Sequence, residues 1–266
     1  MALLHFGERR FAADLVIFDK DGTLIDFTHL WAGKTAAAVQ ALVQGVGGDA
    51  TLAQALYATL GYDPDTGRFA TQSPVLTAAM PTLYTIAATV LYQQGWGWLP
   101  AELAVAAHFA PAMDGAFGRE MIRPTADLPA LFGALARAGV QIAVITSDDH
   151  GPTATTLAWL EVDHWVGFLA GADDPYPHKP APDAVWAACR ALGVEPARAA
   201  YVGDSTTDML MAQRAGVGLR VAVRTGLMDA DTLRPHADIV LESIGEIEVV
   251  TSQWSCGFQR LWSEGG

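Results

Sequence analysis

The feature that most constrains this chain is a short apolar run that ends in acidic residues. Residues 15–18 (Leu-Val-Ile-Phe) are all apolar, and Asp19, Asp21 and Gly22 follow within four positions. A continuous apolar run of this length, ended by polar residues and a glycine, is typical of a parallel strand buried on both faces. The carboxyl ends of such strands open into the crevice where α/β proteins bind ligands. The sequence therefore predicts a sheet edge that carries two carboxylates.

The second half of the chain alternates between apolar runs and helical patterns. Strands are expected at residues 140–145, 166–169, 199–202, 217–223 and 237–241, and helices at 126–138, 153–160 and 182–192 and in a segment that ends at Ala215. Alternation of this kind predicts an α/β fold, with a Rossmann-like parallel sheet covered by helices on both faces.

The segment between the first strand and residue 119 has a different pattern. Helical periodicity is visible at 26–43, at 74–93 and at 100–119, and Asp49 is expected to cap a further helix that ends at Leu60. We therefore expect an all-helical cap domain over residues 27–119. It would be inserted into a core formed by residues 1–26 and 120–266.

Composition excludes several classes of protein. Hydrophobic residues make up 51% of the 266 residues and charged residues 17%, which allows a sizeable core and argues against global disorder. The net charge of -13 argues against sequence-independent nucleic-acid binding, although one local cationic site would still accommodate a phosphorylated substrate.

Compartment and membrane association can also be judged from the sequence. Cys189 and Cys256 are the only cysteines, so no disulfide framework is expected and a reducing, cytoplasmic setting is the default. The first ten residues lack the pattern of a signal peptide, and the apolar stretch at 78–92 is interrupted by Pro81. We expect a soluble protein that does not bind membranes, and the oligomeric state stays open.

Polar residues follow each of the three most apolar strands. Asp19 and Asp21 follow the first strand, Thr146 and Ser147 the second, and Asp204 and Asp208 the third. Since parallel strands end at one edge of the sheet, residues far apart in the sequence are expected to converge there. Lys179 lies directly before Pro180, and two nearby prolines restrict the backbone that carries its side chain.

Together these segments resemble the four motifs of the haloacid dehalogenase (HAD) superfamily in their proper order. The segment Asp19-Lys20-Asp21-Gly22-Thr23 is similar to the first motif, and Thr146 after its strand to the second. Lys179 with its prolines resembles the third, and the segment 203–208 (Gly-Asp-Ser-Thr-Thr-Asp) the fourth. The resemblance is to the phosphoglycolate-phosphatase-like branch, and it implies that the helical insertion is a C1 cap.

The resemblance implies a phosphatase that hydrolyses a small phosphomonoester, with a phosphoglycolate-like compound as one candidate. Asp19 would attack phosphorus and carry a transient aspartyl phosphate, and Asp21 would act first as general acid and then as general base. Thr146 and Ser147 would bind phosphoryl oxygens, and Lys179 would balance the charge on the nucleophile and the phosphate.

The same resemblance implies a Mg²⁺ cofactor. Asp19, the backbone carbonyl of Asp21 and Asp204 would bind the ion, because Mg²⁺ prefers carboxylate and carbonyl oxygens. Asp208 would be a supporting acid one helical turn further on. The expected partner is a small phosphorylated metabolite.

Single residues distinguish a phosphatase from related enzymes that use the same nucleophilic aspartate. Asp21 argues against a dehalogenase, which lacks an acid at this position. Lys20 is reminiscent of P-type ATPases, but strand alternation points it away from the Asp19 side chain, so no catalytic role is expected for it. A phosphosugar mutase would use the same two aspartates, and a HAD fold that only binds ligands is a third alternative.

Other polar residues have simpler interpretations. Thr146 and Ser147 would also serve as caps of the following helix, and Asp204 as a cap without a metal. Candidates for substrate recognition on the cap side are polar residues that more often are ordinary surface residues: His29, Lys34, Arg68 and Arg119.

Overall fold

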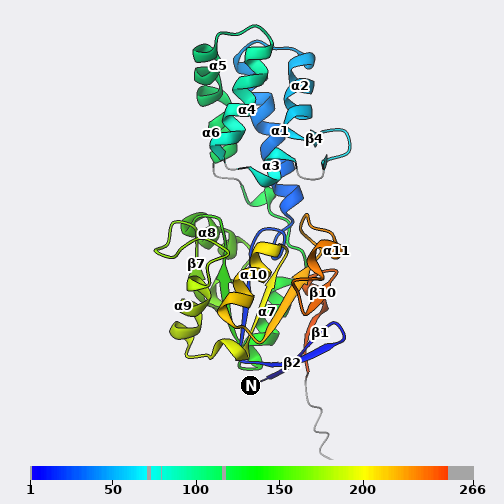
Figure 1. Ribbon diagram of the computed structural model, residues 1–266, viewed down its shortest axis with the longest axis vertical. Helices are drawn as coiled ribbons and strands as arrows, with labels where there is room; N and C mark the ends of the chain where they lie inside the picture. Colours follow the sequence, from blue (N-terminus) through cyan, green and yellow to red (C-terminus); the bar gives the residue numbers. More distant parts are fainter. Residues whose placement is uncertain (1, 71–72, 79, 116–117, 251–266) are drawn as a thin grey trace, which may run out of the picture.

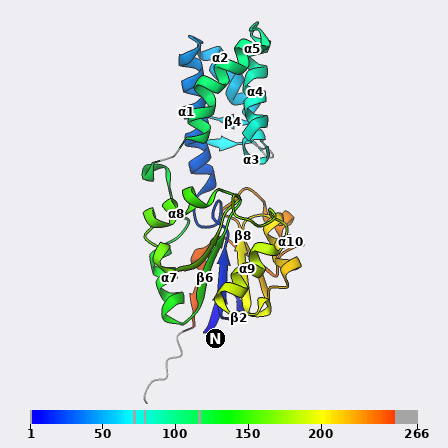
Figure 2. The same cartoon turned by 90° about the vertical axis from the view of Figure 1, so that its left-hand side faces the viewer.

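The protein consists of two parts stacked along its long axis (Figures 1 and 2). The computed structural model describes residues 2–70, 73–78, 80–115 and 118–250. An α/β core holds both ends of the described chain, and a helical insertion lies above it. The C-terminal tail, residues 251–266, lies outside the described residues.

The core is built on a parallel sheet. Among the described residues six strands form it, in the order β10-β9-β8-β3-β6-β7. Their bounds are Leu15–Phe18 for β3, Gln141–Ile145 for β6, Val166–Ala170 for β7, Ala199–Gly203 for β8, Leu219–Val223 for β9 and Ile239–Leu241 for β10. All five neighbouring pairs are parallel, and β3 lies between β6 and β8. The predicted α/β fold is confirmed.

The apolar run of β3 is buried on both faces because helices cover both. Val16 and Phe18 belong to one hydrophobic cluster, and Leu15 and Ile17 to another on the opposite face. This division follows the two-residue period of a strand. Helices α7 (Leu128–Arg137) and α8 (His150–Trp159) contribute to the first cluster, and α9 (Asp183–Leu192) and α10 (Thr206–Ala215) to the second.

A small antiparallel sheet, which sequence patterns did not predict, extends the first face. Strands β1 (Ala2–Phe6) and β2 (Arg9–Ala13) form a hairpin, and β11 (Ile247–Val249) pairs with β1. The pairing joins the beginning and the end of the described chain, so it leaves no local signal. Shorter elements complete the core: α11 (Ala230–Leu233) and the 3-10 turns Asp163–Trp165, Pro196–Arg198 and Ile244–Glu246.

The insertion is helical, with one exception. Its helices are α1 (Phe27–Gly45), α2 (Ala50–Leu60), α3 (Pro74–Thr77), α4 (Met80–Gln93), α5 (Trp98–Ala104), a π-helical turn (Val105–Phe109), α6 (Ala110–Asp114) and a 3-10 turn (Arg119–Met121). The predicted helical insertion is confirmed. In addition, β4 (Tyr62–Asp63) and β5 (Arg68–Phe69) form a minimal hairpin in the turn-rich segment after α2. The domain boundaries stay a prediction.

Prolines explain why two predicted helices are interrupted. Residues 74–93 form α3 and α4 rather than one helix, and the backbone of Ala78 between them is extended. Pro81 lies in the first turn of α4, where a missing N–H is tolerated. Pro111 lies inside the predicted helix 100–119, and the π-helical turn ends two residues before it, at Phe109. Proline removes a backbone donor in a helix interior, which disturbs the regular hydrogen-bond ladder.

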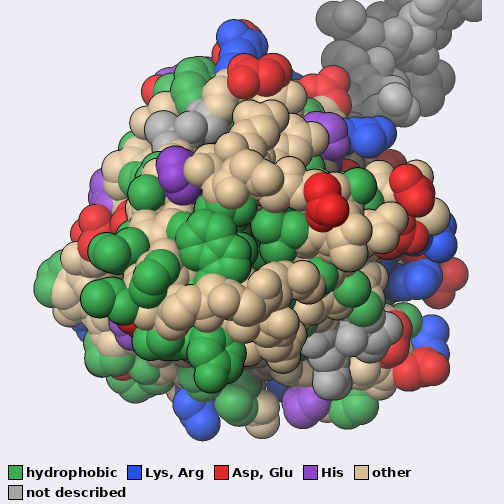
Figure 3. Space-filling view, turned by 90° about the horizontal axis from the view of Figure 1, so that it is seen from above, with side chains coloured by type: hydrophobic (Ala, Val, Ile, Leu, Met, Phe, Trp, Pro, Cys, Tyr) green, Lys and Arg blue, Asp and Glu red, His purple; other side chains and the backbone are tan. Residues whose placement is uncertain are grey.

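The cap has a separate hydrophobic cluster and an apolar end. Buried residues of α1, α2, α4 and the π-helical turn pack together, separately from the two clusters of the core. Figure 3, a view onto the end of the cap, shows hydrophobic side chains grouped near its centre. Large exposed apolar residues of this region are Tyr92, Trp98, Leu99 and Leu103. None of the helices in the described part of the chain combines the length and the apolar character that crossing a membrane requires.

Two chain segments connect cap and core, and they bind each other. The amide of Asp26 donates to the carbonyl of Arg123 at 2.8 Å, and the amide of Thr125 donates to the carbonyl of Leu24 at 3.0 Å. The side chain of Asp26 also caps α1 by accepting from the amide of His29. The helix that enters the cap therefore begins at a fixed point beside the end of β3.

Candidate active site

The sheet places Asp19 and Asp204 on adjacent strands. Phe18 of β3 lies opposite Val202 of β8, and the amide of Asp19 donates to the carbonyl of Val202 at 2.9 Å. Strand β8 ends one residue later, at Gly203, and Asp204 follows it directly. The prediction that residues nearly two hundred positions apart converge at one edge is confirmed for this pair.

Lys179 completes the centre of this group. Its ammonium donates to Oδ1 of Asp19 at 2.6 Å and to Oδ1 of Asp208 at 2.7 Å, and all three side chains are almost fully buried. Burial alone lowers the pKa of Lys179, but the two carboxylates raise it well above its usual value. The lysine is therefore a fixed positive charge between two acids.

Asp208 is held on several sides. Its Oδ1 accepts from the hydroxyl of Tyr201 at 3.1 Å, and its Oδ2 accepts from the hydroxyl of Ser205 at 2.6 Å. Ser205, rather than Asp204, is the N-cap of α10, and Asp208 completes the capping box. The interpretation of Asp204 as a helix cap is therefore wrong. Asp208 is buried and hydrogen-bonded, in contrast to an exposed helical acid.

Three carboxylates are close enough to share one cation. Oxygens of Asp19, Asp204 and Asp208 all lie within 4.8 Å of one another. Oδ2 of Asp19 is buried and accepts no hydrogen bond. A methyl group in place of a hydrogen on Gly22 would approach an oxygen of Asp204 to 2.3 Å, and one on Gly226 to 1.7 Å. Both glycines are therefore needed for the backbone to pass close to this carboxylate.

The electrostatics of this cluster favour a divalent cation. The pKa of Asp19 is raised to about 7, because burial and the charge of Asp208 together outweigh the opposing effect of Lys179. Burial, together with Asp19 and Asp208, raises the pKa of Asp204 well above its usual value. One lysine does not compensate three carboxylates. The hard oxygen ligands and the buried, unbonded oxygen of Asp19 fit Mg²⁺.

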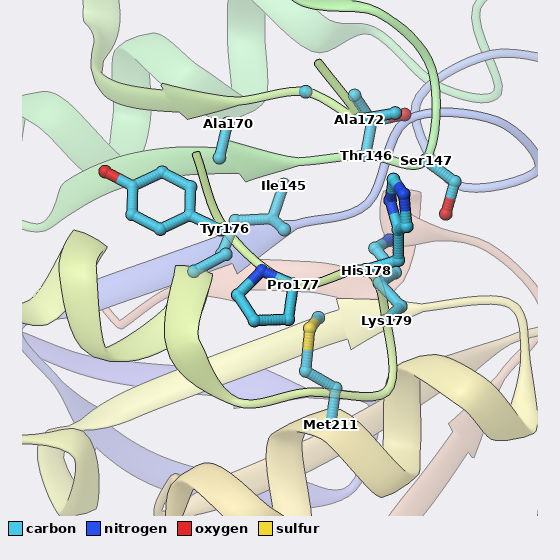
Figure 4. A pocket seen from close by; sticks show the side chains of 12 residues that line it. Ile145, Thr146, Ser147, Ala170, Ala172, Tyr176, Pro177, His178, Lys179 and Met211 are labelled. Carbon is cyan, nitrogen blue, oxygen red and sulfur yellow. The ribbon is translucent and has the colours of Figure 1, made fainter. Parts of the chain in front are cut away.

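Thr146 and Ser147 line a pocket beside Lys179. Figure 4 shows their side chains on one side of this pocket, with His178 and Lys179 close by. Thr146 is buried, and its hydroxyl accepts from the amide of Asp148 at 3.1 Å, whereas Ser147 is exposed. The interpretation of this pair as helix caps is wrong, since α8 begins after Asp149.

Asp21 lies apart from the three-carboxylate cluster. Its Oδ1 accepts from the ammonium of Lys20 at 2.8 Å, and Lys20 also forms an ion pair with Asp148 at 3.0 Å. Lys20 is fully buried. Burial lowers its pKa, but the two carboxylates outweigh this effect and raise it. Sequence reasoning discounted this lysine; its place between two acids at the end of a buried strand was the available signal.

The cap-side candidates Lys34 and Arg119 differ in their contacts and in their distance from the site. The ammonium of Lys34 donates to the carbonyl of Met113 at 3.0 Å, and its charge interacts with Asp148, Lys20 and Asp21. Burial lowers the pKa of Lys34. Arg119 forms an exposed ion pair with Glu161 at 3.3 Å. Lys34 is the cap-side candidate that lies within electrostatic reach of the site.

Known proteins share this fold. A crystal structure of a HAD-superfamily hydrolase of subfamily IA from Geobacter sulfurreducens is similar, with a TM-score of 0.60 and 18% sequence identity. The similarity covers 89% of this chain and 95% of that one. It includes the helical insertion between β3 and β6, as expected for a C1 cap.

Curated relatives are similar in sequence. A phosphoglycolate phosphatase from Escherichia coli O157:H7 is 26% identical over 238 residues, which cover 87% of this chain and 90% of the relative. One from Rhodospirillum rubrum is 39% identical over 88 residues, which cover 33% of this chain and only 36% of the relative. The model of the haloacid dehalogenase-like hydrolase family matches residues 13–216. The chain thus belongs to the haloacid dehalogenase-like hydrolases, and it is an enzyme of that family.

Proposed function

We propose that this protein is a Mg²⁺-dependent phosphatase that hydrolyses a small phosphomonoester through an aspartyl phosphate. The observation that carries the proposal is the environment of Asp19. This buried carboxylate contacts an ammonium group at 2.6 Å, shares a cluster with two further carboxylates and keeps one oxygen without a hydrogen bond. A nucleophile beside a fixed positive charge and a cation site is what phosphoryl transfer requires.

Each residue of the site has a role in this proposal. One carboxylate oxygen of Asp19 attacks phosphorus, and Asp21 gives a proton to the leaving oxygen. Asp21 then removes a proton from the water that hydrolyses the aspartyl phosphate. Lys179 balances the charge of the nucleophile and the phosphoryl group, and Thr146 and Ser147 donate to phosphoryl oxygens.

Mg²⁺, when bound by Asp19, Asp204 and the backbone carbonyl of Asp21, supplies positive charge next to the phosphoryl oxygens. Asp208 supports the arrangement by fixing Lys179, with which it forms a 2.7 Å contact. Since Asp208 also belongs to the carboxylate cluster, it adds negative charge that favours cation binding.

The substrate in this proposal is a small phosphorylated metabolite in the cytoplasm. A cap over the crevice favours small substrates, because closed sites exclude water and bulky groups. The named phosphoglycolate phosphatases among the relatives make 2-phosphoglycolate the first compound to try. Specificity depends on cap residues, and the low identity to these relatives leaves other phosphomonoesters in the screen.

The first experiment measures phosphate release from p-nitrophenyl phosphate with and without Mg²⁺. We expect activity in the wild type that chelation abolishes, and a loss of at least about 10³-fold in Asp19→Asn. Asp238→Asn is the matched control, since Asp238 precedes β10 at the opposite edge of the sheet and pairs with Arg220. Equal activity in wild type and Asp19→Asn would contradict the proposed mechanism.

Product analysis separates the phosphatase from a mutase. With a sugar phosphate as substrate, a phosphatase releases inorganic phosphate, whereas a mutase returns the phosphoryl group to another hydroxyl of the sugar. If no phosphoester is turned over by protein that binds Mg²⁺, the protein is a binding module instead.

A further inference from the structure

Lys20 has an environment that the proposed reaction does not yet explain. Its side chain is fully buried, and its ammonium contacts Oδ1 of Asp21 at 2.8 Å and Oδ2 of Asp148 at 3.0 Å. The two acids are partly exposed, at 22% and 38% of their side-chain area. A lysine is rarely buried completely unless its charge is paired. Here both partners are parts of loops that line the site.

The contact joins the loop after β3 to the loop after β6. Asp148 is itself fixed, because its amide donates to the hydroxyl of Thr146 at 3.1 Å and its carbonyl accepts from the amide of Ala172 at 2.8 Å. On the other side, the carbonyl of Lys20 accepts from the amides of Leu24 and Ile25 at 2.8 and 3.1 Å. Lys20 therefore links Asp21 to the hydrogen-bonded loop after β6, which carries Thr146 and Ser147.

We infer that Lys20 is a positioning residue, which holds the carboxylate of Asp21 by Oδ1 so that Oδ2 transfers the proton. The inference rests on the proposed function. In the first step Oδ2 gives its proton to the ester oxygen as the P–O bond breaks. In the second step the same oxygen takes a proton from the attacking water as the aspartyl phosphate is hydrolysed, which restores the acid.

A purely structural role makes a different prediction. A buried ion pair is weak evidence for stability, and a methionine of similar length can replace a buried lysine when the former partners reach water. Asp21 and Asp148 are both partly exposed, so Lys20→Met leaves neither charge trapped. We therefore expect this variant to fold and to bind Mg²⁺, which circular dichroism and calorimetry would check.

The decisive measurement is the dependence of kcat/KM on the leaving group. An alkoxide leaves only when protonated, whereas p-nitrophenolate is stable and leaves without help from an acid. Lys20→Met should lose about 10- to 100-fold with the alkyl phosphate that the wild type hydrolyses fastest, but less than about threefold with p-nitrophenyl phosphate. Arg220→Met, which breaks the remote ion pair with Asp238, should leave the ratio of the two rates unchanged.

A second variant keeps the test valid if Lys20→Met does not fold. Asp148→Asn removes the charge on the far side of the ammonium, and we expect it to lower the alkyl-to-aryl ratio about three- to tenfold. Equal losses with both esters in folded Lys20→Met, or an unchanged ratio in Asp148→Asn if that is the variant that folds, would overturn the positioning role. A wild type without phosphatase activity would overturn the proposed function first, and this inference with it.

Discussion

The edge of the core sheet and the interior of the cap bury different kinds of side chain. In the core, Asp19, Lys20 and Asp208 are charged groups that are buried, and each contacts an opposite charge. In the described part of the cap, the buried cluster consists of apolar side chains. Burial strengthens electrostatic interactions between the charged groups at the sheet edge, whereas in the cap cluster it stabilises apolar packing.

The comparison teaches where each kind of change should act. A sheet edge positions charged groups by strand register and backbone hydrogen bonds, and it tolerates little change. A bundle with its own apolar cluster can be altered while the core geometry stays the same, and the cap is thus suited to set specificity. Substitutions in the two regions should therefore separate chemistry from stability.

After Asp19→Asn, the largest effect is expected at Lys179. Lys179→Met leaves Asp19 and Asp208 buried without their shared cation, so phosphatase activity should fall about 10²- to 10³-fold. The free energy of unfolding should fall by about 3–5 kcal/mol in the metal-free protein, because uncompensated charge stays buried. Steady-state kinetics and urea unfolding measure the two effects. Activity within a factor of two of the wild type would show that the sheet edge does not depend on this contact.

The corresponding change in the cap removes apolar volume. Leu91→Ala should cost about 2–5 kcal/mol of stability, because Leu91 is fully buried in the cap cluster. Leu15→Ala in the core is the matched control, with the same truncation at an equally buried position of β3. Mg²⁺ affinity, measured by calorimetry, should persist in the cap variant. If Mg²⁺ binding fell equally in both variants, cap and site would be energetically inseparable.

Asp208→Asn tests a group that supports the site without being the nucleophile. The substitution keeps the size of the side chain but removes the charge that Lys179 contacts at 2.7 Å. We expect activity or Mg²⁺ affinity to fall about 10- to 100-fold, as for other residues that orient a metal site. Titration of activity with Mg²⁺ distinguishes the two. A loss as large as that of Asp19→Asn would place Asp208 among the reacting groups.

The pH dependence of stability should be smaller but diagnostic. Because burial raises the pKa of Asp19 to about 7 in the metal-free protein, its contribution to stability is present below about pH 4 and is lost as pH rises through 7. Without metal, Asp19→Asn should therefore have a higher Tm than the wild type at pH 8, and the difference should shrink as the pH falls towards 4.

Addition of Mg²⁺ sharpens this test. Mg²⁺ at one hundred times its Kd should raise the Tm of the wild type by about 5–10 °C at pH 8 and should raise that of Asp19→Asn less. Differential scanning calorimetry with and without chelator makes the comparison. A wild type whose metal-free Tm exceeds that of the variant at pH 8 would contradict a pKa of Asp19 that burial raises to about 7.

Much of the architecture was predictable because its signals are local. The run at 15–18 and the run at 199–202 are apolar over the length of a buried strand, and both form neighbouring strands of the sheet. Asp49 at the start of α2 caps that helix as predicted, by accepting from the amides of Thr51 and Leu52. The break between α3 and α4 and the π-helical turn before Pro111 were missed because helical periodicity continues across them.

Other features were not predictable because their partners are far apart. Strand β1 pairs with β11 across more than 240 residues, and neither strand has a strong pattern of its own. The β4–β5 hairpin has two residues in each strand, too few for a periodic signal. The role of Lys20 depends on Asp148, whose position relative to β3 only the β3–β6 register defines.

By itself the sequence determined which residues are available for chemistry: a carboxylate pair after one strand, a threonine after a second, an acid after a third and a lysine beside prolines. It did so because strand ends and helix starts are local events that apolar runs, glycines and prolines mark. Only the tertiary structure decided which of these charged groups contact one another. Asp19 contacts Lys179, Asp208 joins the carboxylate cluster, and Asp21 contacts Lys20. Such pairings depend on the order of strands in the sheet, since a distance of a few ångströms between charges is a property of packing and not of spacing along the chain.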